Sequence, residues 1–297
     1  MGYGNHALRV ATSLYLIPLL LALGVSESAL AEFRLRAMTG NITSGNAQSY
    51  DEGHGIRIFQ AFAPQVALVQ EMNYRASSPA DIRAFVDEAF GKRYHYYREP
   101  AREGAIPNGI VSEWPILESG SLKDPTIDNR GIAWARIELP EGKTLWAFSG
   151  HFSHDGSGRR SRAAEVVLDF VMKRAKGEDF LLFGADGNFT NRKEPAMELL
   201  KKFFSDAQVP VGAEGRDGTN TSRSKPYDVL LPNRALEKHH ICVEILTKGG
   251  NSVKFPHGLV FDSRSFKPLS AVPPVQAGDS AAKNMQHMAI VKDFLIR

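Results

Sequence analysis

The peptide FLLFGADGN, residues 180–188, joins a short apolar run to two polar side chains, Asp186 and Asn188. Four consecutive apolar residues followed by glycine are typical of a buried strand, and the glycines permit a tight turn at its end. An aspartate and an asparagine two residues apart can face one ligand there, because the carboxylate coordinates a cation or accepts a proton while the amide donates to a phosphate oxygen. An ordinary Asp-Gly turn is the alternative for this segment taken alone.

Two other apolar runs end in a polar side chain in the same way. VALVQE ends at Glu71 and TLWAFSGH ends at His151, and a further histidine, His287, directly precedes the last apolar run of the chain. A carboxylate at a strand end is held rigidly enough to bind a hard cation, although a solvated strand end explains Glu71 equally well by itself. Two histidines that each stand at the end of a strand favour a general acid–base pair over two structural imidazoles.

The rest of the chain alternates short β-rich apolar runs with stretches of helical periodicity, which predicts mixed α and β structure. Two loops rich in glycine, serine or proline, 211–225 and 265–280, are not followed by a stretch able to form its own core. We therefore expect one domain over 32–297, with sheets packed face to face and helices outside. Strands are expected at 33–38, 66–70, 109–112, 132–137, 144–150, 180–183, 227–231, 241–246 and 288–294. Helices are expected at 55–62, from Ser78 or Pro79 to Phe90, at 161–176 and at 197–204.

The composition is that of an ordinary globular protein. The chain has 297 residues, 43% of them hydrophobic and 23% charged, and a formal net charge of +3. This charge does not by itself indicate a nucleic-acid binder, since local clusters matter more than the total. The single cysteine, Cys242, excludes an internal disulfide and a zinc site built from thiolates, and its apolar neighbours predict a small buried side chain.

Residues 1–31 have the features of a cleaved export signal. Arg9 precedes an apolar run over 10–25, and the triplet ALA at 29–31 matches a small-x-small cleavage site. The run is shorter than the roughly 20 apolar residues that a membrane-spanning helix needs. We therefore predict export to the periplasm or the outside of the cell, a mature chain that starts near Glu32, and no stable membrane insertion after cleavage.

The polar residues occur in a fixed order along the chain, and this order resembles the endonuclease/exonuclease/phosphatase superfamily, the group that includes DNase I. The resemblance spans 32–294 and implies an α/β (α+β) fold. That fold is a DNase I-like four-layer sandwich of two face-to-face mixed β-sheets with helices on both outer faces and the site at one rim. The residues that carry it are Asn41, Gln70-Glu71, His151, Asp186 with Asn188, Tyr227-Asp228 and His287.

The resemblance also implies a metal site. Glu71 resembles the family's magnesium ligand, with Asn41 beside it, so that Mg²⁺ is the expected ion and Mn²⁺ or Ca²⁺ are the alternatives. The family's closing Asp-His pair reads Gln286-His287 in this chain. Because glutamine carries no charge, we expect a lower metal affinity or a lower rate than an acidic residue would give.

The same resemblance implies catalytic roles. Asp186 resembles the residue that orients or deprotonates the attacking water, and Asn188 resembles a donor to the phosphate oxygens. His287 resembles the histidine that contacts the phosphate, with Asp228 fixing its orientation and His151 as the second histidine. One extra residue, an alanine, stands between the glycine and Asp186, but the spacing from Asp186 to Asn188 is kept.

Two further features bear on the substrate. Arg159, Arg160 and Arg162 stand at the expected start of a helix, where the helix dipole disfavours cations. A polyanionic partner would explain them, and a solvated helix end is the alternative. Asn108 is assigned as an uncharged phosphate contact or as the group that orients His151, with a turn asparagine as the alternative.

These observations predict an exported, monomeric, metal-dependent phosphodiesterase, most simply an endonuclease-like hydrolase acting on DNA or RNA. A sphingomyelinase-like lipid phosphodiesterase and an inositol-phosphate phosphatase are the alternatives within the class. A non-catalytic binding module on the same fold is the alternative from another class, and the uncharged Gln286 is the feature that favours it.

Overall fold

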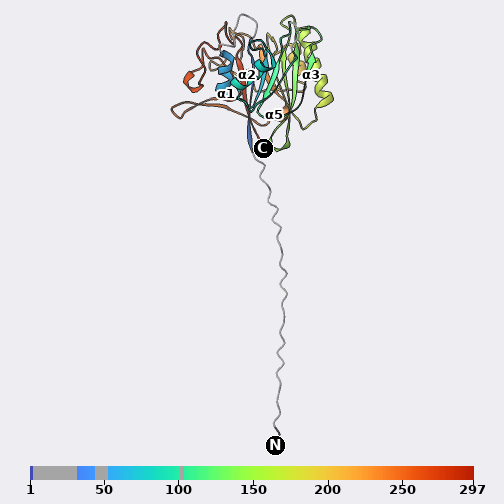
Figure 1. Ribbon diagram of the computed structural model, residues 1–297, viewed down its shortest axis with the longest axis vertical. Coiled ribbons are helices and arrows are strands. Elements are labelled where there is room, and N and C mark those ends of the chain that lie inside the picture. Colours follow the sequence, from blue (N-terminus) through green and yellow to red (C-terminus); the bar gives the residue numbers. More distant parts are fainter. Residues whose placement is uncertain (3–31, 44–52, 101–103) are drawn as a thin grey trace. The chain divides into compact units, whose positions relative to one another are not determined.

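Two β-sheets form the centre of the protein in its computed structural model (Figure 1). The structure describes residues 1–2, 32–43, 53–100 and 104–297, so the predicted export signal lies outside the described residues. Sheet A has the strand order β10-β14-β1-β2-β4-β3, with β13 also paired to β14. Its strands are β1 (Phe33–Asn41), β2 (Val66–Gln70), β3 (His95–Arg98), β4 (Gly109–Ser112), β10 (His240–Ile241), β13 (Leu259–Phe261) and β14 (Ala289–Ile296).

Sheet B has five strands in the order β5-β6-β7-β8-β9, and only β7 and β8 run parallel. A separate two-stranded hairpin of β11 and β12 lies outside both sheets. The strands are β5 (Ile116–Lys123), β6 (Gly131–Glu138), β7 (Thr144–His151), β8 (Phe180–Asp186), β9 (Asp228–Pro232), β11 (Val243–Leu246) and β12 (Ser252–Phe255).

Alternation along the strands produces the layers. In β2, Val66 and Leu68 pack into a core between the two sheets, whereas Ala67 and Val69 pack into a second core on the outer face of sheet A. Successive side chains of a strand point to opposite faces, so a strand that is apolar throughout must be covered on both. A third core lies on the outer face of sheet B and includes Val167. The result is the predicted four-layer sandwich.

Helices cover both outer faces, as Figure 1 shows for α1 and α2 on one side and α3 on the other. Helix α2 begins with a capping box, in which Ser78 accepts from the backbone of Asp81 and the Asp81 carboxylate accepts from the backbone of Ser78. Among the described residues, no helix has the length and apolar character needed to cross a membrane. The helices are α1 (His54–Phe62), α2 (Pro79–Ala89), α3 (Ser157–Arg174), α4 (Pro195–Leu200) and α5 (Arg234–Glu237), with 3₁₀ turns at Pro140–Gly142 and Leu269–Ala271.

Some predicted elements differ from the structure. Helix α3 starts at Ser157, four residues before the predicted position, and ends at Arg174 because Ala175 is extended. The predicted strand 241–246 is divided at Cys242, which is half-buried and not buried as expected. Its sulfur lies 3.5 Å from the Val243 carbonyl oxygen. The strands β3, β5, β12 and β13 were not predicted.

Candidate active site

Three neighbouring strands of sheet B place three polar side chains side by side. His151 is the last residue of β7, Asp186 is the last residue of β8, and Asp228 is the first residue of β9. In the strand register His151 pairs with Asp186, and Asp186 pairs with Asp228. The apolar runs of β7 and β8 therefore form buried strands, as their sequence patterns predicted. Each of these two strands ends in a polar group at the same rim.

Sheet A brings two more polar residues to the same rim. Asn41 is the last residue of β1, and Glu71 directly follows β2. The Asn41 amide nitrogen donates to Glu71 Oε1 at 3.1 Å and to Asp186 Oδ2 at 2.9 Å, which joins the two sheets. The sheets approach closely here because Gly184 has no side chain, since a Cβ atom would stand 2.6 Å from Leu68.

The orientation of Asn41 changes the role that the motif predicted for it. Its Oδ1 accepts a hydrogen bond of 2.7 Å from the backbone N–H of Thr43. Turning the amide over would set its NH₂ group against that N–H, so the oxygen faces away from Glu71. Asn41 is therefore placed to position the Glu71 and Asp186 carboxylates as a donor, and not to offer its oxygen to a metal beside Glu71.

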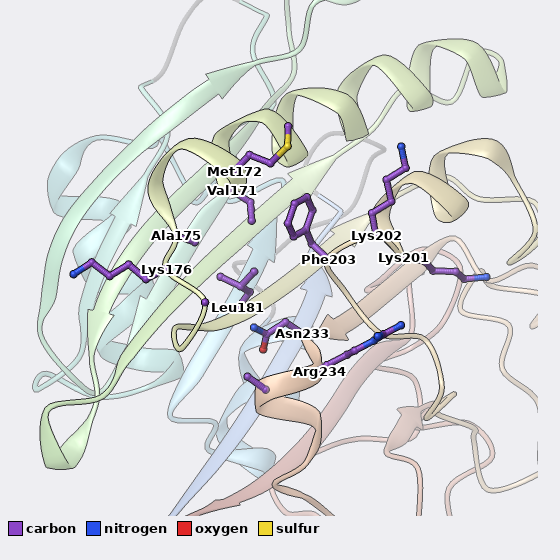
Figure 2. A pocket seen from close by; sticks show the side chains of 12 residues that line it. Val171, Met172, Ala175, Lys176, Leu181, Lys201, Lys202, Phe203, Asn233 and Arg234 are labelled. Carbon is purple, nitrogen blue, oxygen red and sulfur yellow. The ribbon is translucent and has the colours of Figure 1, made fainter.

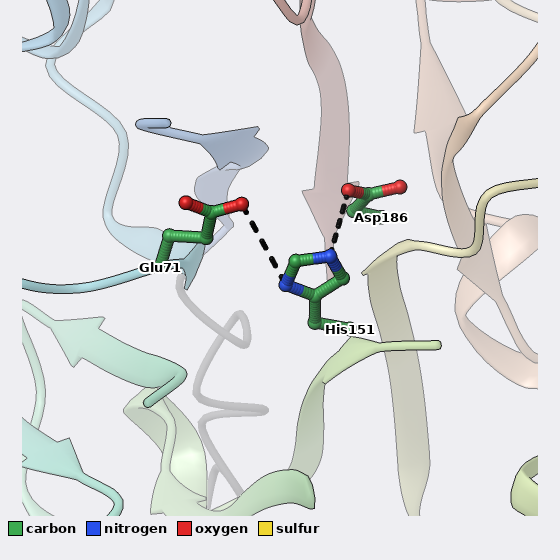
Figure 3. A group of neighbouring side chains, drawn as sticks. All are labelled: Glu71, His151 and Asp186. Carbon is green, nitrogen blue, oxygen red and sulfur yellow. Dashed lines mark ion pairs between the residues drawn. The ribbon is translucent and has the colours of Figure 1, made fainter. Parts of the chain in front are cut away.

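His151 lies between two carboxylates (Figure 3). Its Nε2 is 3.1 Å from Asp186 Oδ2, which is hydrogen-bonding distance, and its Nδ1 is 3.9 Å from Glu71 Oε1, which is not. His151 Nδ1 is buried and has no hydrogen-bond partner in the described part of the chain. Because a buried polar atom without a partner is costly, this atom marks a place where a further group completes the site.

His287 faces the other side of Asp186. Its Nδ1 lies 3.0 Å from Asp228 Oδ2, and its Nε2 lies 3.9 Å from Asp186 Oδ2. Burial alone would lower the pKa of His287, but the negative charges of Asp228 and Asp186 outweigh it and raise this pKa to about 10. The ring is therefore an imidazolium at neutral pH, with Nε2 turned toward the site.

The two carboxylates around His287 differ in their pKa values. Burial raises the pKa of Asp186, but the facing His287 and His151 rings and two hydrogen bonds outweigh burial and hold it well below its usual range. Burial raises the pKa of Asp228 in spite of the same imidazolium. The proton of this pair stays on His287 because Asp186 adds a second negative charge on the opposite side of the ring.

Glu71, His151, Asp186 and His287 line a cavity of about 550 Å³. Residues that sequence reasoning did not single out line it as well. The most informative of them is Arg130, just before β6, whose residue is only 9% exposed. Its Nε and Nη1 atoms are buried without a hydrogen-bond partner among the described residues. Burial lowers the pKa of Arg130, but a guanidinium stays charged in proteins. No periodicity or spacing distinguishes this arginine in the sequence.

Two site residues have strained backbones. Glu71 has a φ of 55° and Asn188 has a φ of 49°, both in the left-handed region that non-glycine residues seldom adopt. The backbone N–H of Asn188 donates to Asp186 Oδ1 at 3.0 Å, and its side-chain amide donates to the Phe152 carbonyl at 3.1 Å. One N–H of that amide remains available to a ligand. Strain of this kind is concentrated at functional sites, where the surrounding structure imposes it.

The predicted substrate contacts do not join this cavity. Arg160 is buried and paired with Glu194 at 2.7 Å, so its guanidinium belongs to a structural ion pair. Arg162 lies 3.4 Å from Glu165, and Arg159 lies 3.9 Å from Asp155, both on the exposed surface. Asn108 is fully buried and donates to Glu99 and to the Gly131 carbonyl, not to His151. The burial and the partners of Arg160 and Asn108 contradict the contacts predicted for them.

A second cavity, of about 500 Å³, lies between the end of α3, the turn after α4 and the start of α5 (Figure 2). Leu181 at the beginning of β8 lines it, whereas Asp186 ends the same strand, so the two cavities lie at opposite ends of sheet B. Its described lining residues include lysines and an arginine but no carboxylate or imidazole. It therefore lacks the groups that hydrolytic chemistry requires.

The donors at the rim fit a divalent cation. Glu71, His151 and Asp186 each offer one ligand atom within 4.8 Å of the others. Glu71 Oε2 accepts no hydrogen bond from the described residues, and His151 Nδ1 is the buried atom without a partner. Carboxylate oxygens suit Mg²⁺, Ca²⁺ and Mn²⁺, whereas an imidazole nitrogen suits ions such as Zn²⁺ and Fe²⁺.

No family model matches this chain, and no curated protein matches it at a significant level. Solved structures do match. An endonuclease/exonuclease/phosphatase from Bacteroides vulgatus has a TM-score of 0.59 and 16% identity, and the alignment covers 89% of this chain and 99% of that one. TDP2 of D. rerio in complex with a single-strand DNA product has a TM-score of 0.55 and 15% identity, with 88% and 98% covered. A mannosyl-6-phosphatase of Bacteroides thetaiotaomicron has a TM-score of 0.55 and 12% identity, with 89% and 100% covered.

Identities this low establish a likeness of fold. The chain has the fold of the endonuclease/exonuclease/phosphatase proteins, over nearly the whole length of the three structures named above. This confirms the architecture that the order of the sequence motifs predicted.

Proposed function

We propose that this chain is a divalent-metal-dependent phosphoester hydrolase that cleaves phosphodiester bonds, with nucleic acid as its substrate. One observation carries the proposal. A single cavity combines a carboxylate–imidazole cluster with the guanidinium of Arg130, whose two buried nitrogens have no partner among the described residues. Phosphate oxygens are the acceptors that a buried guanidinium matches best.

The phosphate would be held by cationic and neutral donors from three directions. The Arg130 guanidinium and the His287 imidazolium both line the cavity, and the Asn188 amide keeps an N–H available there. Asp228 fixes the His287 ring through Nδ1, so that the Nε2 proton points toward the site. Donors fixed in advance stabilise the charge that grows on the phosphoryl oxygens during in-line attack.

The attacking water would be oriented by Asp186. Its depressed pKa keeps the carboxylate charged, so it accepts a hydrogen bond from the water more readily than it takes the proton fully. Asn41 and His151 hold its Oδ2 in place at 2.9 Å and 3.1 Å. Glu71 would be the main residue to hold a divalent cation, which would supply charge neutralisation for the reacting phosphate.

Other proteins of the same fold support phosphoester hydrolysis. The matched structures include TDP2 with a single-strand DNA product and a mannosyl-6-phosphatase. Nucleic acid is proposed as the substrate for two reasons. The cavity offers the donors of Arg130, His287 and Asn188, which together form a phosphate cradle, and it also offers the aromatic ring of Tyr227. We propose that the enzyme acts as an exported monomer, in line with the signal-like residues 1–31.

The test is a substrate panel incubated with the mature chain. Supercoiled plasmid, single-stranded RNA, sphingomyelin, an inositol phosphate and bis(4-nitrophenyl) phosphate are each incubated with Mg²⁺, Mn²⁺ or Ca²⁺, and with EDTA. We expect cleavage of plasmid or RNA and of the bis-aryl diester, abolished by EDTA. Hydrolysis of sphingomyelin alone would make the enzyme a lipid phosphodiesterase. Absence of turnover with every substrate and metal would leave a non-catalytic module.

A further inference from the structure

A third, smaller cavity lies next to the active-site cavity. It has a volume of about 310 Å³ and shares Tyr227, Gln286 and His287 with its larger neighbour. The half-exposed Tyr227 therefore lines both cavities. Its other described lining residues, Asn220, Thr221 and Ser222, carry amide and hydroxyl groups and no carboxylate.

The loop that forms this cavity, 219–225, is held in one conformation by its own hydrogen bonds. Asn220 Oδ1 accepts from the backbone N–H groups of Ser224 and Lys225, at 2.8 Å and 3.0 Å. The Thr219 N–H donates to the Lys225 carbonyl at 2.8 Å. Arg223 is buried beneath the loop and donates to the Gly218 carbonyl at 2.6 Å. A surface built in this way is organised before a ligand arrives.

The 219–225 loop is also tied to the catalytic groups. The Thr219 hydroxyl accepts from the Asp228 N–H at 2.8 Å, and the Thr219 carbonyl accepts from the Met288 N–H at 2.7 Å. The Thr221 hydroxyl donates to the Gln286 carbonyl at 3.1 Å. The loop is therefore in fixed register with the Asp228–His287 pair, and a ligand on it lies at a fixed place relative to the phosphate cradle.

The exposed groups of this loop match a sugar–phosphate unit and a base. Lys225 makes no ion pair with any described residue, and its ammonium lies 5.8 Å from the centre of the Tyr227 ring. The Ser222 and Ser224 hydroxyls are exposed next to it. An ammonium with neighbouring hydroxyls suits a phosphate, and an aromatic ring stacks on any base because every base has a π face.

We propose that the 219–225 loop and Tyr227 form a second subsite, which binds the nucleotide next to the scissile phosphate. The substrate is therefore an extended oligonucleotide strand and not a phosphate monoester. This inference rests on the proposed function. A phosphate monoester carries an organic group on only one side of its phosphate, whereas a strand continues on both sides of the scissile phosphate.

Binding without turnover tests the subsite separately from catalysis. The affinity of the full mature chain for a fluorescein-labelled oligothymidylate is measured by anisotropy in EDTA at several salt concentrations. Lys225→Ala is compared with Lys248→Ala, which removes an equally exposed lysine without an ion pair from the turn of the β11–β12 hairpin. A lost phosphate contact on a single strand lowers the slope of log K against log salt by about 0.7. We expect this reduction for Lys225→Ala only.

A second pair of variants tests the stacking platform. Tyr227→Phe keeps the ring and Tyr227→Leu removes it, so we expect the first to bind like the wild type and the second to lose at least about fivefold in affinity. Unchanged salt slopes together with equal affinities of the two Tyr227 variants would overturn the subsite even if the wild type cleaves DNA. If no phosphodiester is cleaved while Lys225 still sets the salt slope, the proposed function fails and the binding subsite stands.

Discussion

The two cavities at opposite ends of β8 differ in chemistry much more than in size. The cavity beside Asp186 has a volume of about 550 Å³ and the cavity beside Leu181 about 500 Å³. The first contains buried polar atoms without partners on His151 and Arg130, whereas the second is lined by apolar side chains and solvent-facing lysines (Figure 2). Volume therefore does not identify the site in this protein. Between these two cavities, buried polar atoms without partners among the described residues distinguish the one beside Asp186.

The largest effect that would test this contrast is at Asp186. Asp186→Asn keeps the shape and the contact with His151 but removes the charge that orients water. We expect kcat/KM for bis(4-nitrophenyl) phosphate to fall by about 10³-fold, in the range for a positioned acid–base group. Phe203→Leu in the other cavity is the matched control, and its kcat/KM should stay at the wild-type level. Equal losses in the two variants would remove the distinction between the cavities.

Arg130 and Arg160 are both buried, but they differ in their partners. Arg130 has two nitrogens without a hydrogen-bond partner among the described residues, whereas Arg160 pairs with Glu194. Arg130→Ala should lower kcat/KM by about 10²-fold, because a donor to the phosphoryl oxygens is lost. It should not destabilise the fold, since the removed charge has no hydrogen-bonded partner at Nε or Nη1. Arg160→Ala should do the reverse. It leaves the buried Glu194 carboxylate without its cationic partner, with only Thr190 among the described residues still donating to it, and costs about 3–5 kcal/mol of unfolding free energy, with the kcat/KM of folded protein unchanged.

Urea unfolding curves and steady-state kinetics on the same preparations measure both quantities for these two arginines. If Arg130→Ala unfolds at much lower urea than the wild type while keeping its kcat/KM, Arg130 is structural. The assignment of the phosphate cradle would then lose its main cationic group.

A third buried cation, Lys292 on β14, should affect only stability and its pH dependence. It lies outside both cavities, and burial lowers its pKa from 10.5 to about 8. Between these values the unfolded chain binds more protons than the folded one, so Lys292 makes the free energy of unfolding rise with pH. Lys292→Met should remove this contribution, so that the free energy of unfolding, measured by urea unfolding from pH 7 to 11, falls more steeply between about pH 8 and 10 than in the wild type. The exposed Lys254→Met is the control.

His287 has the opposite effect on the pH dependence of stability, because it makes the free energy of unfolding fall as the pH rises. Its folded pKa of about 10 lies above the ordinary 6.5, so its stabilisation is complete below pH 6.5 and is lost as the pH rises through 10. In Lys292→Met this fall should therefore remain and become easier to see. A pH dependence of the free energy of unfolding that is the same in Lys292→Met and in the wild type would mean that Lys292 does not contribute to it.

The strand-end residues were predictable because their signal is local. An apolar run that stops at a polar residue shows both the strand and the rim, and this located Glu71, His151 and Asp186. The contacts of Arg160 were not predictable, since its partner Glu194 is 34 residues away. Neither was Arg130, a single arginine with no pattern around it, whose importance comes only from what packs nearby.

Strand β5 was missed for a related reason. Its sequence, ILESGSLK, has few apolar residues, and alternate positions are only half-buried. The strand pairs with β6, and Gly120 allows its backbone to lie against the Trp134 ring, where a Cβ atom would stand 2.9 Å away. A contact of that kind between strands β5 and β6 is visible only in three dimensions.

Neither sheet holds a complete set of reacting groups. Sheet A supplies Asn41 and Glu71, sheet B supplies His151 and Asp186, and the Asn41 amide spans the seam between them. Each sheet alone therefore holds only half of the proposed site. If the chain has the activity proposed above, turnover depends on how the two sheets dock, and a treatment that loosens their interface lowers turnover before either sheet loses its strands.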